Sequence, residues 1–183
     1  MQSYADEFGI IPGKDVPRTP SAPGEVLQKA EPENQLDAEQ QQIYRSGVGK
    51  LLHMMKWSRP DILNSVRELS RFMTEASTAH MSAMIRTMKY CCGTPNRGVL
   101  LHPNATWDGN PNFEFVVSGR SDSDYAKDPE RRRSVSGYST FLHGAPVTTR
   151  CRMQGCVTLS VTEAELAITL TILKGRVLEV ETL

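Results

Sequence analysis

Apolar side chains recur at helical spacing through residues 37–93, and this regularity constrains the fold more than any other feature of the chain. A first stretch covers about 37–55, a second 58–73 and a third 78–93. The apolar side of the first stretch consists of Ile43, Val48, Leu51, Leu52 and Met55. We therefore predict three helices in succession.

The boundaries of these helices have recognisable signals. Ser58 can cap the second helix, Pro60 fits its first turn, and Asp61 suits the positive end of the helix dipole. Gly93 is a suitable C-terminal stop for the third helix, and His80 can cap or hydrogen-bond near its start.

The hydrophobic period changes after Gly98, where stretches typical of strands replace the helical pattern. Strands are expected at 99–101, 113–117, 137–142 and 147–152, with a short β-prone stretch at 156–160. A helix is expected from about Thr162. Strands in succession followed by a helix indicate an α+β class.

Residues 1–40 are rich in proline and glutamine and carry a net negative charge, so we predict a disordered or extended linker there. The chain as a whole has a net charge of zero, but residues 41–160 are net basic and both ends are acidic. A basic middle is compatible with binding a phosphate backbone, and a solvated helical surface is the equally open alternative.

The sequence also indicates in which cellular compartment the protein is found. The sequence has neither a membrane-length apolar run nor a basic-then-apolar signal pattern, so we expect an intracellular protein, cytoplasmic or nuclear, that is not secreted. The four cysteines lack a metal-ligand spacing and are expected to be free thiols.

Two acidic residues attract attention as candidate metal ligands. Asp122 lies in S-G-R-S-D-S-D-Y at 118–125, and Glu165 lies in T-L-S-V-T-E-A-E-L-A at 158–167. Taken singly, an Asp-x-Asp pair is most often a turn former, and a glutamate near a helix start is common for dipole reasons. Arg131, Arg132 and Arg133 are candidates for phosphate contacts, with a charged hairpin tip as the alternative.

Several separate blocks, in order and spacing, resemble copia-type retrotransposon polyproteins. They are Y-R-S-G-V-G-K-L-L-H-M-M-K-W-S-R-P-D-I at 44–62, V-R-E-L-S-R-F-M at 66–73, K-Y-C-C-G-T at 89–94, S-G-R-S-D-S-D-Y-A-K-D-P-E-R-R-R-S-V-S-G-Y at 118–138, and T-L-S-V-T-E-A-E-L-A at 158–167. The resemblance covers about 140 residues, from Tyr44 onward.

The resemblance implies a domain order and a site. Residues 41–95 would be the helical segment that connects a reverse transcriptase to its ribonuclease H domain, and residues 98–183 would be part of that ribonuclease H-like domain, with a mixed sheet. Asp122 and Glu165 would be catalytic ligands of Mg²⁺ or Mn²⁺, and an RNA–DNA hybrid would be the substrate. The remaining segments of the polyprotein are possible partners.

The resemblance also implies features that are missing here. The sequence contains no adjacent Asp-Asp pair of the polymerase type, and no further strand carboxylate follows the helix of Glu165 before Leu183. We therefore expect an incomplete ribonuclease H-like domain with weak or absent hydrolysis of RNA in hybrids. The alternatives are a non-catalytic nucleic-acid-binding module that uses the basic region 41–160 and, third, an interaction protein built on the 41–93 helices.

Overall fold

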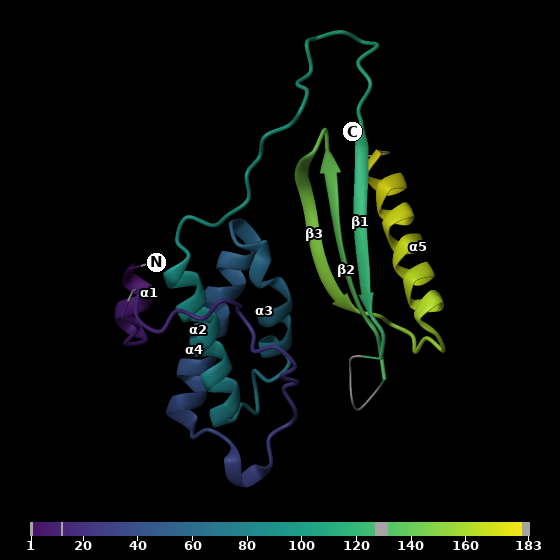
Figure 1. Cartoon of the computed structure of the whole chain (residues 1–183). Helices are drawn as coiled ribbons and strands as arrows, with labels where there is room; N and C mark the ends of the chain where they lie inside the picture. The colour runs from purple at the N-terminus through teal and green to yellow at the C-terminus, as the bar shows by residue number, and fades with distance from the viewer. Residues whose placement is uncertain (1, 12, 127–131, 181–183) are drawn as a thin grey trace. The chain divides into compact units, whose positions relative to one another are not determined.

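The computed structural model describes residues 2–11, 13–126 and 132–180, and the chain divides into two units, Met1–Val99 and Leu100–Leu183 (Figure 1). The first unit is helical. The second contains a three-stranded antiparallel sheet and one long helix. The expected α+β class is confirmed at this level.

The three expected helices of the first unit are confirmed. They are α2 (Ala38–Trp57), α3 (Leu63–Ser70) and α4 (Thr78–Gly93). Their facing side chains form one apolar cluster, which includes Tyr44, Val48, Leu51, Val66, Leu69, Met84 and Met88. Two members of the predicted apolar side of α2 do not join this core, because Ile43 and Leu52 are exposed.

The predicted cap at Ser58 is wrong. Ser58 is instead the C-terminal cap of α2, and its backbone N–H and its hydroxyl both donate to the Met54 carbonyl. Pro60 does begin the next element, the short 3-10 helix η2 (Pro60–Ile62) that leads into α3. At α4, Ser77 is the N-cap and His80 accepts a hydrogen bond from the Ser77 backbone N–H at 2.9 Å, which confirms the local role expected of His80.

The N-terminal segment, for which the sequence predicts a disordered or extended linker, lies against these helices. It contains α1 (Gln2–Glu7) and the 3-10 helix η1 (Pro32–Asn34). Ala5 and Ile10 are buried in the cluster of the helical unit. The Leu36 backbone N–H donates to the Ala76 carbonyl at 2.9 Å, so the segment is joined to the chain just before α4.

The second unit is a meander of β1 (Val117–Asp124), β2 (Val135–Leu142) and β3 (Ala145–Met153), each antiparallel to the next. The β2–β3 connection consists of His143 and Gly144, both with positive φ, which is the geometry of a two-residue hairpin turn. α5 (Val161–Val180) runs alongside β1 and packs on β1 and β2 (Figure 1).

The strand predictions are partly wrong. Those at 137–142 and 147–152 are confirmed within β2 and β3, and the helix expected from about Thr162 is confirmed as α5. Residues 99–101 and 156–160 form no strand, and of 113–117 only Val117 belongs to β1. Apolar runs at 99–101 and 113–116 lack a ladder partner, whereas the polar stretch after Val117 pairs with β2 along its whole length.

Candidate functional site

Asp122 lies within β1 and is paired with Gly137 of β2. Its side chain is exposed. Because side chains alternate along a strand, Asp122 and Ser123 point to opposite faces of the sheet. The strand that carries this aspartate, β1, is polar and mostly exposed.

Glu165 lies in the first turns of α5 and is half-buried. Its Oε1 accepts hydrogen bonds from the backbone N–H of Ser123 at 3.1 Å and from the Ser123 hydroxyl at 2.7 Å. A strand N–H that donates to a side chain is not part of the ladder with β2, so this bond lies at the outer edge of β1. Glu165 therefore joins α5 to the strand residue next to Asp122.

The start of α5 is fixed by its own sequence. The Ser160 hydroxyl accepts from the Glu163 backbone N–H at 3.1 Å, and a Glu163 carboxylate oxygen accepts from the Leu159 backbone N–H at 2.6 Å. Such reciprocal bonds satisfy backbone donors that a helix start leaves without partners. Glu163 thus belongs to the helix start, and Glu165 lies two residues further along.

A buried polar network that the sequence does not signal holds α5 on the sheet. The Gln154 amide donates to the Ser136 hydroxyl at 2.8 Å and to the Ala164 carbonyl at 3.0 Å. The hydroxyls of Ser134 and Thr158 are 3.0 Å apart and buried. No motif marks these residues, because each depends on a partner at least ten positions away in the sequence.

The oxygen ligands of Asp122 and Glu165 are of the type that magnesium and manganese prefer. Both bonds from Ser123 go to Oε1 of Glu165, so Oε2 is left for another interaction. The number of ligands does not suffice for a metal pair, since among the described residues no group of three His, Cys, Asp or Glu side chains could hold a metal ion. The residues fit in type but not in number.

The predicted phosphate contacts lie in the β1–β2 connection. Arg132 is exposed and has a positive φ, and Arg133 is half-buried. Arg131 lies outside the described residues. Both described arginines are thus in the hairpin connection, as the alternative of a charged tip also expects. Within the described ranges, no helix has the length and apolar character needed to cross a membrane.

Known proteins similar to this chain include transposon polyproteins. The Retrovirus-related Pol polyprotein from transposon RE1 of Arabidopsis thaliana is 34% identical over 122 residues, which are 67% of this chain and 8% of that protein. The corresponding protein from transposon TNT 1-94 of Nicotiana tabacum is 31% identical over 122 residues, again 67% of this chain and 8% of that protein. The chain thus corresponds to a small part of these polyproteins.

A shorter relative matches over most of its length. Secreted RxLR effector protein 161 of Plasmopara viticola is 36% identical over 122 residues, which are 67% of this chain and 80% of that protein. No protein-family model and no solved structure matches the chain.

Proposed function

The chain belongs to the family of transposon-encoded, retrovirus-related Pol polyproteins and their shorter relatives, and on that premise we propose a more specific assignment. Residues 41–95 are the segment that connects a reverse transcriptase to a ribonuclease H domain, and residues 98–183 are part of that domain. The ancestral activity is metal-dependent hydrolysis of RNA in RNA–DNA hybrids. An intracellular location, where reverse transcription takes place, is part of the proposal.

One observation supports this assignment above the others. Glu165 from α5 bonds to Ser123, so the two sequence blocks meet at one end of β1, although the Asp122 side chain points to the face of the sheet opposite to that of Ser123. A meander of three antiparallel strands followed by a helix across β1 and β2 is also compatible with a ribonuclease H-like sheet.

The proposed role of the ligands follows from their chemistry. Metal-dependent hydrolysis of a phosphodiester needs hard oxygen ligands that hold the metal ions. The ions in turn would activate water and stabilise the leaving oxygen. Asp122 and Glu165 would supply two such carboxylates. Because two carboxylates hold a pair of ions poorly, we expect the chain by itself to have weak activity or none.

The test is cleavage of a labelled RNA–DNA hybrid by the purified chain with Mg²⁺ or Mn²⁺. Weak cleavage that Asp122→Asn and Glu165→Gln both abolish would support the assignment. Glu114→Gln is the matched control, because Glu114 is an exposed carboxylate of the same unit outside the proposed site. Cleavage that survives both ligand substitutions would contradict the roles of these residues, and efficient cleavage would contradict the expected weakness.

A specific observation favours a second candidate, the non-catalytic nucleic-acid-binding module. Near the end of α2, the exposed Trp57 has the Lys56 ammonium 5.2 Å from its ring centroid, and His53 lies 6.4 Å from that ring. An exposed aromatic ring next to a lysine ammonium is a surface on which a base can stack, while the cation attracts the phosphate backbone.

This second function has its own test. Binding of a single-stranded oligonucleotide should weaken steeply as the salt concentration rises. Its affinity should be the same in Asp122→Asn and Glu165→Gln as in the unchanged chain. Trp57→Ala should weaken binding by about 1–3 kcal/mol if one base stacks there. Trp107→Ala is the control, since this exposed tryptophan lies in the second unit. If Trp57→Ala left the affinity unchanged, the surface around Trp57 would be excluded as the binding site.

A further inference from the structure

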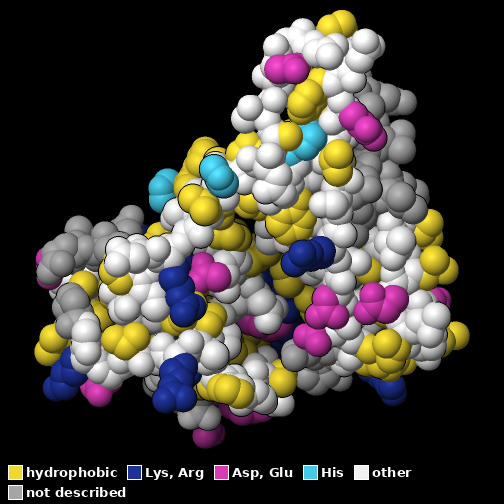
Figure 2. All heavy atoms as spheres, turned by 45° about the horizontal axis from the view of Figure 1, so that its top comes forward, with side chains coloured by type: hydrophobic (Ala, Val, Ile, Leu, Met, Phe, Trp, Pro, Cys, Tyr) yellow, Lys and Arg dark blue, Asp and Glu magenta, His cyan; other side chains and the backbone are white. Residues whose placement is uncertain are grey.

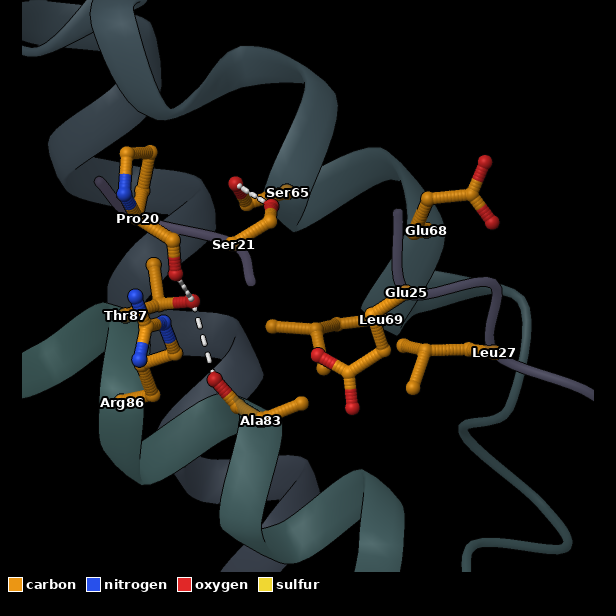
Figure 3. Close-up of a pocket in the computed structure, with 10 residues that line it drawn as sticks. All are labelled: Pro20, Ser21, Glu25, Leu27, Ser65, Glu68, Leu69, Ala83, Arg86 and Thr87. Carbon is orange, nitrogen blue, oxygen red and sulfur yellow. Dashed lines mark hydrogen bonds between the residues drawn. The ribbon is translucent and has the colours of Figure 1, made fainter. Parts of the chain in front are cut away.

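Residues 18–27 of the N-terminal segment cross the helical unit without forming helix or strand. The Pro20 carbonyl accepts from the Thr87 hydroxyl at 3.2 Å, and the hydroxyls of Ser21 and Ser65 are bonded to each other. A hollow open to solvent separates this segment from α3 and α4 (Figure 3). The segment is therefore held to both helices by these hydrogen bonds and, at its end, by Leu27, which packs against the apolar cluster.

Thr19 stands at the edge of this contact. Its side chain is exposed, and its hydroxyl donates to the Ser21 carbonyl at 2.7 Å. The same hydroxyl accepts one long hydrogen bond from Nη2 of Arg86, at 3.3 Å. A guanidinium group of α4 therefore already lies against the Thr19 oxygen.

Arg86 has hydrogen-bond donors that its contact with Thr19 does not use. Its Nε is buried and has no hydrogen-bond partner among the described residues. Within the described residues no carboxylate forms an ion pair with it. A guanidinium has five N–H donors in a planar fork and remains charged, so Arg86 can bind an anion of fitting geometry.

The next residue after Thr19 is proline, the neighbour that proline-directed protein kinases require. The chain has a second Thr-Pro pair, Thr94-Pro95, which provides an internal comparison. The Thr94 hydroxyl accepts from Arg59 at 2.8 Å and donates to the Tyr90 carbonyl at 2.7 Å, and its side chain is half-buried. Both hydroxyls are hydrogen-bonded, but the side chain of Thr19 is exposed and that of Thr94 is half-buried.

We propose that Thr19 is a phosphorylation site and that its phosphate binds Arg86, which fixes the N-terminal segment on α4. In the modification, a kinase transfers the γ-phosphoryl group of a nucleoside triphosphate to the Thr19 oxygen. The O–P bond to threonine forms as the β–γ bridge breaks, the nucleoside diphosphate leaves, and the hydroxyl proton is released. The inference does not depend on the proposed nuclease or nucleic-acid-binding function.

The local charges are compatible with a phosphate at this position. The hollow also has two carboxylates in its lining, Glu25 and Glu68; in Figure 3 Glu68 points away from Arg86, whereas the Glu25 carboxylate points into the hollow. Arg67 and Arg71 both bond to the Glu68 carboxylate and compensate its charge. A phosphate carries a charge of about −1.5 to −2 and three strong acceptor oxygens, so it replaces one long bond to a neutral hydroxyl by bonds between opposite charges.

The experiment begins with the purified full chain, a proline-directed kinase, Mg²⁺ and ATP, with sites mapped by mass spectrometry. We expect phosphate on Thr19 and not on Thr94, and none at this position in Thr19→Ala. The modified chain should be cleaved after Glu25 by a glutamate-specific protease about tenfold more slowly than the unmodified chain, and added salt should reduce this protection.

Two variants assign the protection to the proposed contact. Arg86→Gln should still accept phosphate on Thr19 but lose the protection, while Arg45→Gln, on the exposed face of α2, should keep it. Thr19→Ser should be modified and protected like the natural chain. The proposal is overturned if Thr19 remains unmodified, if the modified natural chain is cleaved at the unmodified rate, or if protection persists in Arg86→Gln.

Discussion

The helical unit and the sheet unit differ in how they exclude water. The helical unit, Met1–Val99, buries a continuous cluster of apolar side chains from α1, α2, α3 and α4. In the sheet unit, the described large apolar side chains that are buried are Val135 and Ile168, and the other buried groups are mostly polar. Apolar burial is the dominant favourable term in folding, so the helical unit holds most of the stability.

The exposed apolar side chains show the same contrast from the outside. Figure 2 shows hydrophobic side chains scattered among polar groups on the visible surface. Those exposed in the sheet unit are Leu100, Leu101, Trp107, Phe115, Val116, Val117, Val147, Val157, Leu159, Val161, Leu166 and Leu170. The stability of the sheet unit depends less on apolar burial and more on the backbone hydrogen bonds of its strands and on side-chain hydrogen bonds such as those of Gln154 and Glu165. Substitutions should therefore have larger effects in the helical unit.

The largest effect is expected at Arg59, the most constrained cation of the helical unit. Its side chain is 3% exposed and forms two bonds to the Asp61 carboxylate, at 2.9 and 2.8 Å. It also donates to the Thr94 carbonyl at 3.0 Å, near the end of α4. Although burial raises the pKa of Asp61, hydrogen bonds from Arg59 and Tyr90 hold it below its ordinary value.

Arg59→Ala removes both guanidinium bonds to the Asp61 carboxylate, which keeps only the Tyr90 hydroxyl as a donor, and the bond to the Thr94 carbonyl, so we expect a loss of about 4 kcal/mol in the free energy of unfolding. Urea denaturation followed by far-ultraviolet circular dichroism measures it. Arg71→Ala is the control and should cost at most about 1 kcal/mol, because Arg71 is more exposed. Equal losses in the two variants would contradict the role given to Arg59.

The same substitution in each unit tests the contrast directly. Leu69 is 1% exposed in the cluster of the helical unit, while Leu166 on α5 is 59% exposed. Leu69→Ala should cost about 3 kcal/mol, through lost burial and the cavity left behind. Leu166→Ala should change stability by at most about 0.5 kcal/mol. If Leu166→Ala proved as costly in urea denaturation, the sheet unit would have a core that the exposures do not indicate.

Two glycines of α2 allow a comparison within one helix, in which the expected changes in stability are smaller. A Cβ at Gly47 would lie 2.6 Å from Met84 Sδ, whereas nothing lies within 4 Å of a Cβ at Gly49. Gly47→Ala should cost about 1 kcal/mol through overpacking, partly offset by the better helix propensity of alanine. Gly49→Ala should stabilise by about 0.5–1 kcal/mol. Opposite signs in thermal unfolding are the expected result, and the same sign would exclude close packing at Gly47.

The smallest effect at neutral pH concerns His80, whose ring stacks on Phe72 with centroids 4.1 Å apart. Burial lowers the pKa of His80 in the folded chain, and a hydrogen bond with the backbone of Gln28 partly opposes this shift. The unfolded chain then binds the proton more strongly. The stabilising contribution is complete above the unfolded pKa of about 6.5 and is lost as the pH falls through the folded pKa.

Unfolding by urea at a series of pH values measures this dependence. His80→Asn should remove the part of the slope below about pH 6.5, while His53→Gln, on the exposed face of α2, should retain it. An unchanged slope in His80→Asn would mean that another group titrates.

The sequence predicts α2 and α4 well because their signals are local. Helical spacing involves residues within a few positions of one another. It fails for the strand that carries Asp122, since S-G-R-S-D-S-D has low strand propensity and β1 exists through its pairing with β2. The Arg59–Asp61 pair was missed for a related reason, because its burial depends on the distant end of α4.

The order of the helices, the strands and the final helix can be predicted from the sequence, and so can the blocks that relate the chain to transposon polyproteins. Local spacing and short motifs contain that information. The folded chain is needed to show that Glu165 bonds to Ser123, that Asp122 is exposed on β1, and that Arg86 lies against Thr19. Each of these contacts joins residues more than forty positions apart or depends on strand register, and spacing along the chain does not specify either.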